Sequence, residues 1–452
     1  LSEEPWLKPH VEGWLDNFKI RLSAGSMGNG NVDPYSYTSE MTVVTASDIV
    51  LGGGLPSYTT VGSTVPVSLT WEKSTTYDLG LDLDFLNNRL SFSGDYYRRY
   101  TTDMYTASVA LPAVYGTGSP KGNNAEMKTD GWELSLSWRD SFKLGGKPFD
   151  YSIKAMVWDN RTVVTKYENA TRSLGTLKGY IQNGGSPSDF YEGMELGEMW
   201  GYTVAGLFRD QADIDSSATH DFTQASDKVT RPGQVKIADL DHNGNIDPGA
   251  FTADDHGDLS IIGNINPHYM FGVNLAANWN GIGLSVFLQG VMKRDWYPSP
   301  DSGYFWGKYA RPFMWVLGIH NYTDDMYSEE KNNWDTAYWP RMTTYQSNSS
   351  YSWTKLLEIP NTRYKQNAAY LRVKNIQVDY TFPKALCQKI RLGGLKIYLS
   401  GENLFTFTPL HKYAPNFDPE ALGYDTDFSS TAGDGYTYPV LKSVTLGVNI
   451  TF

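Results

Sequence analysis

The chain has 452 residues, of which 40% are hydrophobic and 14% aromatic, and its mean hydropathy is -0.42. No stretch approaches the roughly 18 consecutive apolar residues of a membrane-spanning helix, which excludes a helical membrane protein. The formal net charge of -12 argues against nucleic acid as a partner, because nucleic-acid-binding proteins present a basic surface.

Five segments in the first part of the chain alternate apolar and polar side chains with a period of two residues. They cover residues 14–25, 76–85, 90–100, 132–138 and 149–157. Successive side chains of a strand point to opposite faces, so each segment is predicted to be a strand with one apolar and one polar face. The turn-forming pairs Asn87-Asn88 and Gly145-Gly146 separate neighbouring segments and predict hairpins there.

The same alternation returns in the second part of the chain. Residues 271–277 and 282–288 flank an Asn280-Gly281 turn, and residues 370–382, 395–405 and 438–452 follow. The last segment is the most regular, and it is predicted to be one long strand that ends on Phe452. Together the segments predict about ten strands.

The connections between these segments are alternately short and long. The short ones lie near residues 87, 145, 280 and 388, and the long ones cover residues 28–70, 102–129, 161–267, 294–367 and 406–438. Outer-membrane barrels have this asymmetry, with tight periplasmic turns and long extracellular loops. We therefore predict an all-β transmembrane antiparallel β-barrel whose apolar faces contact outer-membrane lipid and whose polar faces line an aqueous lumen. A soluble β-sandwich would explain the alternation but not the segregation of loop lengths.

Several blocks of the sequence resemble one known family. The run WLDNFKIRLSAG at residues 14–25, followed by Gly28-Asn29, is similar to a block of the SusC/RagA-type TonB-dependent transporters. Further similar blocks occur in family order at residues 69–74, 95–98, 102–104, 131–134, 239–247, 370–375 and 401–405. The resemblance implies a barrel of about 22 strands with an N-terminal plug.

The resemblance also implies a function and partners. These are active import of oligosaccharides or oligopeptides, a SusD-like surface lipoprotein that acts as a lid, and a TonB complex that moves the plug. The chain begins on Leu1, without Met or a signal peptide, so we expect a processed chain or a fragment. Residues 1–452 are then expected to be the C-terminal part of the barrel, without the plug and the N-terminal strands. The alternatives are a passive porin or surface-scaffold barrel and a secreted β-rich glycoside hydrolase.

Residues 239–247 carry oxygen-bearing side chains at the spacing of a calcium-binding EF-hand loop. The candidate metal ligands are Asp239, Asp241, Asn243, Asn245 and Asp247. The twelfth position of the loop holds Ala250 in place of the usual glutamate, and Asp254, Asp255 and Asp258 are the candidates to replace it. The alternative is a turn stabilised by hydrogen bonds from side chains to the backbone, without a metal. We expect Ca²⁺ to stiffen this loop if it binds, and we expect no organic cofactor.

Aromatic residues crowd two of the long connections. The candidate contacts for a substrate or partner are Trp296, Tyr304, Trp306, Trp315, Trp334 and Trp339 in the first, and Tyr413 and Phe417 in the second. Aromatic faces beside polar groups suit a sugar or a peptide side chain. The same residues can instead pack a large loop against itself, and for any single ring packing is the commoner role.

Charged side chains fall on the polar faces of the predicted strands, where they would line the lumen. They are Lys19, Arg21, Asp82, Asp84, Asp95, Arg99, Glu133 and Arg139. The histidines are scattered and no Ser-His-Asp or metal-hydrolase spacing occurs, so we expect no enzyme activity. Cys387, the single cysteine, lies in a predicted short turn and is expected to be inert.

Overall fold

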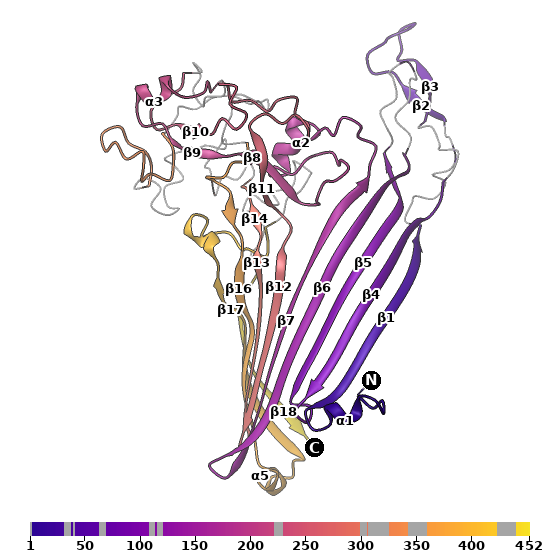
Figure 1. Ribbon diagram of the computed structural model, residues 1–452, viewed down its shortest axis with the longest axis vertical. Coiled ribbons are helices and arrows are strands. Elements are labelled where there is room, and N and C mark those ends of the chain that lie inside the picture. The colour runs from indigo at the N-terminus through magenta and orange to yellow at the C-terminus, as the bar shows by residue number, and fades with distance from the viewer. Residues whose placement is uncertain are drawn as a thin grey trace.

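The computed structural model describes residues 2–30, 38, 41–62, 69–107, 114, 121–220, 229–298, 305, 325–341, 359–422 and 440–452. Its main feature is one antiparallel sheet of ten strands (Figure 1). The strands are β1 (Leu15–Asn29), β4 (Glu72–Phe85), β5 (Leu90–Ala107), β6 (Lys121–Leu144), β7 (Lys147–Lys166), β12 (His268–Trp279), β13 (Ile282–Lys293), β16 (Tyr370–Thr381), β17 (Gly394–Phe407) and β18 (Ser443–Thr451). They lie in this order, so each pairs with its neighbours along the chain and β1 and β18 form the two edges. The all-β prediction with about ten strands is confirmed.

Smaller elements lie beyond the two ends of the sheet. Above it are the pairs β2 (Met41–Thr45) with β3 (Ser57–Val61), β8 (Glu198–Tyr202) with β11 (Leu259–Asn264), β9 (Val204–Leu207) with β10 (Val235–Ile237), and β14 (Asp295–Trp296) with β15 (Gln366–Asn367). The helices of the described residues include α1 (Lys8–Val11), α2 (Leu177–Gln182), α3 (Gln211–Asp215), α5 (Lys384–Lys389) and the 3-10 helix η4 (Pro409–Lys412). Within the described residues, no helix has the length and apolar character needed to cross a membrane.

The turns at the lower end of the sheet are tight where the sequence predicts them. Gly145 and Gly146 have φ of 59° and 78°, and Asn280 and Gly281 have φ of 48° and 90°. Positive φ at both central residues is what a two-residue type I′ hairpin turn requires. The fourth short connection, near residue 388, lies between β16 and β17 as predicted, and it contains the short helix α5, which the sequence did not indicate. Cys387 in this helix is buried.

Several predicted strand limits are also corrected. β5 ends at Ala107 and β6 begins at Lys121, so the connection between them is shorter than the predicted residues 102–129. β18 begins at Ser443, and residues 440–442 are not in a strand. The β17–β18 ladder stops at Glu402, because Asn403 next to it has a φ of 52° and its side-chain amide donates to the Leu441 carbonyl at 3.1 Å. Residues 438 and 439 of the predicted strand lie outside the described residues.

The two faces of the sheet differ in polarity as predicted. Leu79, Leu134 and Val448, on one face, are 50%, 40% and 54% exposed, so this apolar face does not pack against the interior of the protein. The hydrophobic core lies instead in the connections above β12–β17 (Figure 1). Fully buried side chains of this core include Leu174, Tyr202, Trp296, Tyr364 and Leu410.

Aromatic side chains mark two levels on the exposed apolar face. The lower level includes the ring pairs Trp14–Phe85, Phe142–Phe149 and Tyr380–Phe382, and the upper level includes Tyr77, Tyr96 and the pair Trp132–Tyr269. Tyr77 and Phe85 are eight residues apart on β4, a distance of about 27 Å at about 3.4 Å per residue. A strand tilt of about 40° leaves about 21 Å across the membrane, close to the apolar band of about 25 Å in outer-membrane barrels.

Candidate functional site

Ion pairs cross the polar face of the sheet. The Arg21 guanidinium contacts Asp82 on the neighbouring strand at 2.8 Å and Asp95, two strands away, at 2.8 Å. Gly80 lies between them, and a Cβ atom there would come within 2.5 Å of the Asp95 carboxylate and 2.6 Å of the Arg21 guanidinium carbon. Ser93 donates to Asp82 at 2.7 Å. These predicted wall residues therefore form a polar network across β1, β4 and β5.

The other predicted wall residues lie on the same face. Asn17 donates to Asp84 at 3.0 Å, Arg99 donates to Thr76 at 3.3 Å, and Arg139 donates to the Asn88 carbonyl at 2.9 Å. Lys19 pairs in register with Asp82, and Glu133 pairs in register with Asp95. The polar face thus carries many charges, as an aqueous lumen requires.

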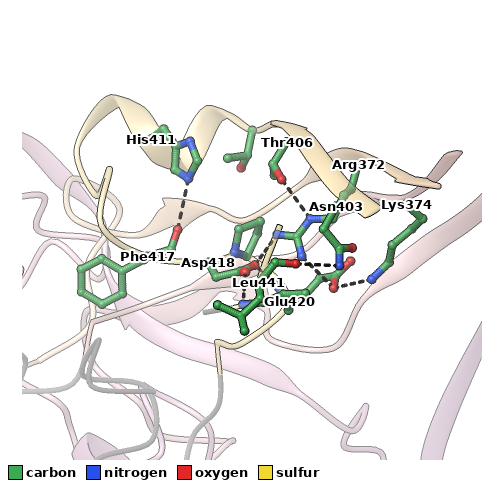
Figure 2. Close-up of polar contacts among 12 residues, drawn as sticks. Arg372, Lys374, Asn403, Thr406, His411, Phe417, Asp418, Glu420 and Leu441 are labelled. Atoms are coloured by element: carbon green, nitrogen blue, oxygen red, sulfur yellow. Dashed lines mark hydrogen bonds and ion pairs between the residues drawn. The ribbon is translucent and has the colours of Figure 1, made fainter. Parts of the chain in front are cut away.

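A buried cluster of charges lies near the upper end of β16 and β17 (Figure 2). The Arg372 side chain is only 3% exposed, and its guanidinium contacts Asp418 at 2.5 Å and Glu420 at 2.9 Å. It also donates to the Thr406 hydroxyl at 2.9 Å, and Lys374 contacts Glu420 at 2.8 Å. Because two cations face two carboxylates, this buried cluster is close to neutral.

A second arginine holds the same segment. Arg294 donates to the carbonyl oxygens of Pro419 at 3.1 Å, Leu422 at 2.7 Å and Ile265 at 3.2 Å. Together with the Arg372 cluster, these bonds fix residues 417–422 to the strands. We call residues 417–422 the clamped segment. The sequence analysis did not identify this clamp, because Arg372 and Asp418 are 46 positions apart and no spacing rule connects them.

The predicted aromatic contacts divide into three groups. Trp296, Trp339 and Phe417 are buried in the hydrophobic core, with Trp296 and Phe417 at 4.9 Å between ring centroids. Trp334 and Tyr413 are partly buried against that core, and the Tyr413 ring stacks on Tyr338 at 3.6 Å. The buried residues Trp296, Trp339 and Phe417 therefore pack the connections against one another in this structure. Tyr304, Trp306 and Trp315 lie outside the described residues.

The acidic segment folds into a compact loop around Asp258. Asp239, Asp241 and Asp258 each present a carboxylate oxygen, and the three oxygens lie within 4.8 Å of one another. Asp258 is fully buried and accepts hydrogen bonds from the backbone N–H groups of Leu240 at 2.6 Å and Asp247 at 3.0 Å. Of the three residues predicted as candidates for the twelfth position of the loop, Asp258 is the one whose carboxylate lies beside those of Asp239 and Asp241.

The remaining predicted ligands make other contacts. Asn243 donates to Asp241 at 3.0 Å, Asp247 accepts from the Gly249 N–H at 2.7 Å, and the Asn245 N–H donates to Asn243 at 2.7 Å. The structure therefore groups the carboxylates of Asp239 and Asp241 with that of Asp258, and the Asp247 carboxylate is not in this group. Hydrogen bonds of this kind, from side chains to nearby backbone groups, are those expected of a turn that is stable without a metal.

The electrostatics of the three carboxylates favour a cation. Burial raises the pKa of Asp258, and the nearby charges of Asp241 and Asp239 raise it further. One oxygen of Asp239 is buried and makes no hydrogen bond within the described part of the chain. Oxygen ligands of this kind suit a hard divalent cation such as Ca²⁺.

A pocket that the sequence analysis missed lies at the upper ends of β1 and β4. Its volume is about 240 Å³, and its lining includes Trp71, Glu72 and Tyr105. Asn123 holds the adjacent Thr70 through two hydrogen bonds of 2.9 Å to the Thr70 N–H and carbonyl. This pocket combines aromatic surface with a carboxylate at the end of the sheet that carries the long connections.

Comparisons with known proteins agree with this architecture. Residues 13–230 match the family described as "TonB dependent receptor-like, beta-barrel". TonB-dependent receptor P3 of Formosa agariphila is 26% identical over 463 residues, which cover 100% of this chain and 41% of that protein. TonB-dependent receptor SusC of Bacteroides thetaiotaomicron is 24% identical and is covered over 39% of its length. The solved structure of the RagAB peptide transporter matches with a TM-score of 0.65 at 21% identity, over 98% of this chain and 41% of that chain. The chain thus spans about two fifths of the length of these relatives.

Proposed function

Because the chain belongs to the β-barrel family of the TonB-dependent receptors, and is of the SusC/RagA type, we propose that it forms part of the barrel wall of an outer-membrane nutrient importer. The observation that carries this proposal is the polarity of the ten-stranded sheet. Its apolar face is exposed between two aromatic levels, and its opposite face carries ion pairs such as Arg21–Asp82. This arrangement suits lipid on one side and water on the other.

The relatives support the proposal that this chain is one part of a larger transport protein. Two of them are named TonB-dependent receptors, and the related RagAB structure is named as a peptide transporter. We propose that this chain supplies ten strands of a barrel of about 22, and that the remaining strands and a plug belong to the rest of the protein. TonB would then drive import by moving the plug.

The substrate class and the lid are also part of the proposal. Oligosaccharides or oligopeptides would enter from the upper end, beneath a SusD-like surface lipoprotein. The compact core around Trp296, Trp339 and Tyr364, fixed to the strands by Arg294 and Arg372, would provide a rigid docking surface for that lipoprotein. Partly exposed aromatic residues, such as Trp334 and Tyr413, are the candidates for contact.

Calcium is proposed as a structural ion of the acidic loop. Asp239, Asp241 and Asp258 would supply its carboxylate ligands, and the ion would offset the mutual repulsion of these groups. No general base or nucleophile is needed for such a role. Its effect would be to stiffen the loop that follows β10.

Uptake measurements test the importer proposal. Cells that express the whole protein are expected to lose uptake of a labelled oligosaccharide or oligopeptide when the proton gradient is collapsed, because TonB draws on that gradient. Uptake that continues unchanged would instead identify a passive porin. A protein that stays soluble without detergent would contradict the barrel itself and would favour a secreted enzyme.

A further inference from the structure

A groove on the lipid-facing side of the sheet has no role in the proposed import function. It crosses β1, β4 and β5, has a volume of about 490 Å³, and is lined mainly by apolar surface. Its lining includes Leu22, Ala24, Tyr77, Leu79 and Arg98. Ala24 lies opposite the much larger Tyr77 in the β1–β4 register, so the small side chain leaves a depression between its larger neighbours.

The groove ends at the level where the apolar band gives way to charge. Arg98 pairs in register with Tyr77, which belongs to the upper aromatic level. One row below, the outward residues are Leu79, Tyr96 and Trp132. In the row of Arg98 they are Tyr77, Arg98, Asp130 and Arg161. Since the aromatic level marks the boundary of the hydrocarbon, Arg98 lies at the depth of the lipid headgroups.

The charges around the upper end of the groove favour an anion. Asp130 is shared by Arg98 at 2.5 Å and Lys128 at 3.3 Å, and the Tyr96 hydroxyl also donates to it at 3.0 Å. Arg161 contacts Glu195 at 2.6 Å. Arg98 and Lys128 therefore share the single carboxylate of Asp130, whereas Arg161 pairs with Glu195, so these five side chains together carry one net positive charge. A guanidinium at this depth is well suited to a phosphate, which it binds through charge-assisted hydrogen bonds.

We propose that this groove binds a phosphorylated lipid of the outer leaflet. One acyl chain would lie over Leu22 and Leu79, its head end would pass over Ala24 in the row of Arg98, and the phosphate would contact Arg98, with Lys128 adding charge. The inference rests on the proposed function insofar as that function places this face of the sheet in the membrane. A lipid is the fitting occupant because the apolar groove and the cationic end occur at the two depths that an acyl chain and its headgroup occupy in a bilayer.

Adjacent arginines on opposite faces of β5 provide a matched test. In Arg98→Gln the lipid-facing cation is lost, whereas in Arg99→Gln the cation of the polar face, which donates to Thr76, is lost. The whole protein is reconstituted in vesicles of equimolar phosphatidylcholine and phosphatidylglycerol, and native mass spectrometry counts the lipids that remain bound. Retained phosphatidylglycerol is expected to fall about tenfold in Arg98→Gln, which corresponds to about 1.4 kcal/mol, and to stay unchanged in Arg99→Gln.

A second variant tests the apolar surface of the groove. Ala24→Phe keeps the face apolar, fills the groove and leaves every charge in place, and it is expected to reduce retained phosphatidylglycerol as well. Equal retention by the unaltered protein, Arg98→Gln and Ala24→Phe would overturn the proposal, as would an equal loss in Arg98→Gln and Arg99→Gln. Displacement of the lipid by soluble glycerol phosphate would also overturn it, because the headgroup alone would then suffice. If the unaltered protein fails to enter vesicles, the importer proposal fails; if it enters but shows no lipid preference, only the groove proposal fails.

Discussion

Replacement of Arg372 by methionine should release the clamped segment without unfolding the sheet. The variant leaves Asp418, whose side chain is 8% exposed, without its cationic partner, and leaves Glu420 with Lys374 alone. Breaking a buried ion pair by removing one partner costs about 3–5 kcal/mol. Because Lys374 still offsets the charge of Glu420, we expect the lower value, about 3 kcal/mol, which is about a hundredfold in the local opening equilibrium.

Hydrogen exchange of the detergent-solubilised protein, followed by mass spectrometry, measures the opening of the clamped segment separately from that of the sheet. The amides of Phe417 and Ala421, both in the clamped segment, donate to backbone carbonyls at 3.2 Å and 3.0 Å, so their protection should fall about a hundredfold in Arg372→Met. The amides of the β17–β18 ladder should keep their protection. Lys374→Met is the matched control, because Arg372 still contacts both carboxylates there, and we expect a much smaller loss. Equal losses in the two variants, or none in either, would refute the role assigned to Arg372.

The same segment should respond to acid in a defined direction. Burial raises the pKa of Asp418, but the Glu420 N–H, the Arg372 guanidinium and the Val440 N–H lower it more, so the pKa in the folded protein is below its usual value. A carboxyl group with a lowered pKa contributes stability that is present above the unfolded pKa of about 3.9 and is lost as the pH falls through the folded value. Protection of the clamped segment, corrected for intrinsic exchange, should therefore stay constant from neutral pH to about 4 and fall below it.

Three further predictions concern other parts of the chain. Asp241→Ala should make the acidic loop more sensitive to protease in the presence of calcium and should have no effect in its absence; equal cleavage of the unaltered protein with and without calcium would remove the metal hypothesis. Since burial and neighbouring charges raise the pKa of Asp258, protons should compete with calcium, so calorimetry should show weaker calcium binding as the pH falls towards that pKa. Gly290→Ala should lower the unfolding temperature of the barrel on heated gels, because its Cβ would lie 2.3 Å from the Tyr370 carbonyl oxygen, an overpacking cost of about 1–3 kcal/mol. Gly25→Ala is its control, since nothing lies within 4 Å of that position, and an equal loss in both would contradict the packing argument.

The strands could be predicted from the sequence because each has a strict period of two. Each of the ten predicted segments corresponds to one strand of the observed sheet, in the predicted order. The upper part of β6 could not be predicted, because outward positions above Trp132 hold Asp130 and Lys128 and the polar contrast between the faces disappears. α5 was missed because a helix of six residues after Pro383 is too short to show a helical period.

The candidate site was only partly predictable. The acidic loop is continuous in sequence, so its candidate metal ligands could be limited to a few residues, and Asp258, whose carboxylate lies beside those of Asp239 and Asp241, was among the three candidates for the twelfth position. The buried aromatic core forms from connections without regular periodicity, so the sequence identified its members, such as Trp296, but not whether they are exposed. The Arg372 clamp depends on a contact between distant segments, which no local pattern indicates.

The central claim is that one face of the sheet contacts lipid and the other contacts water, and neighbouring residues on β6 test it directly. Leu134→Cys and Ser135→Cys place a thiol on the two faces, and the native Cys387 is buried and gives little background. Each variant of the whole protein is labelled with a fluorophore and reconstituted in vesicles. We expect a lipid-soluble quencher to act on the label at position 134 and a water-soluble quencher to act on the label at position 135. Both labels responding to the aqueous quencher, or neither responding to the lipid quencher, would contradict the account.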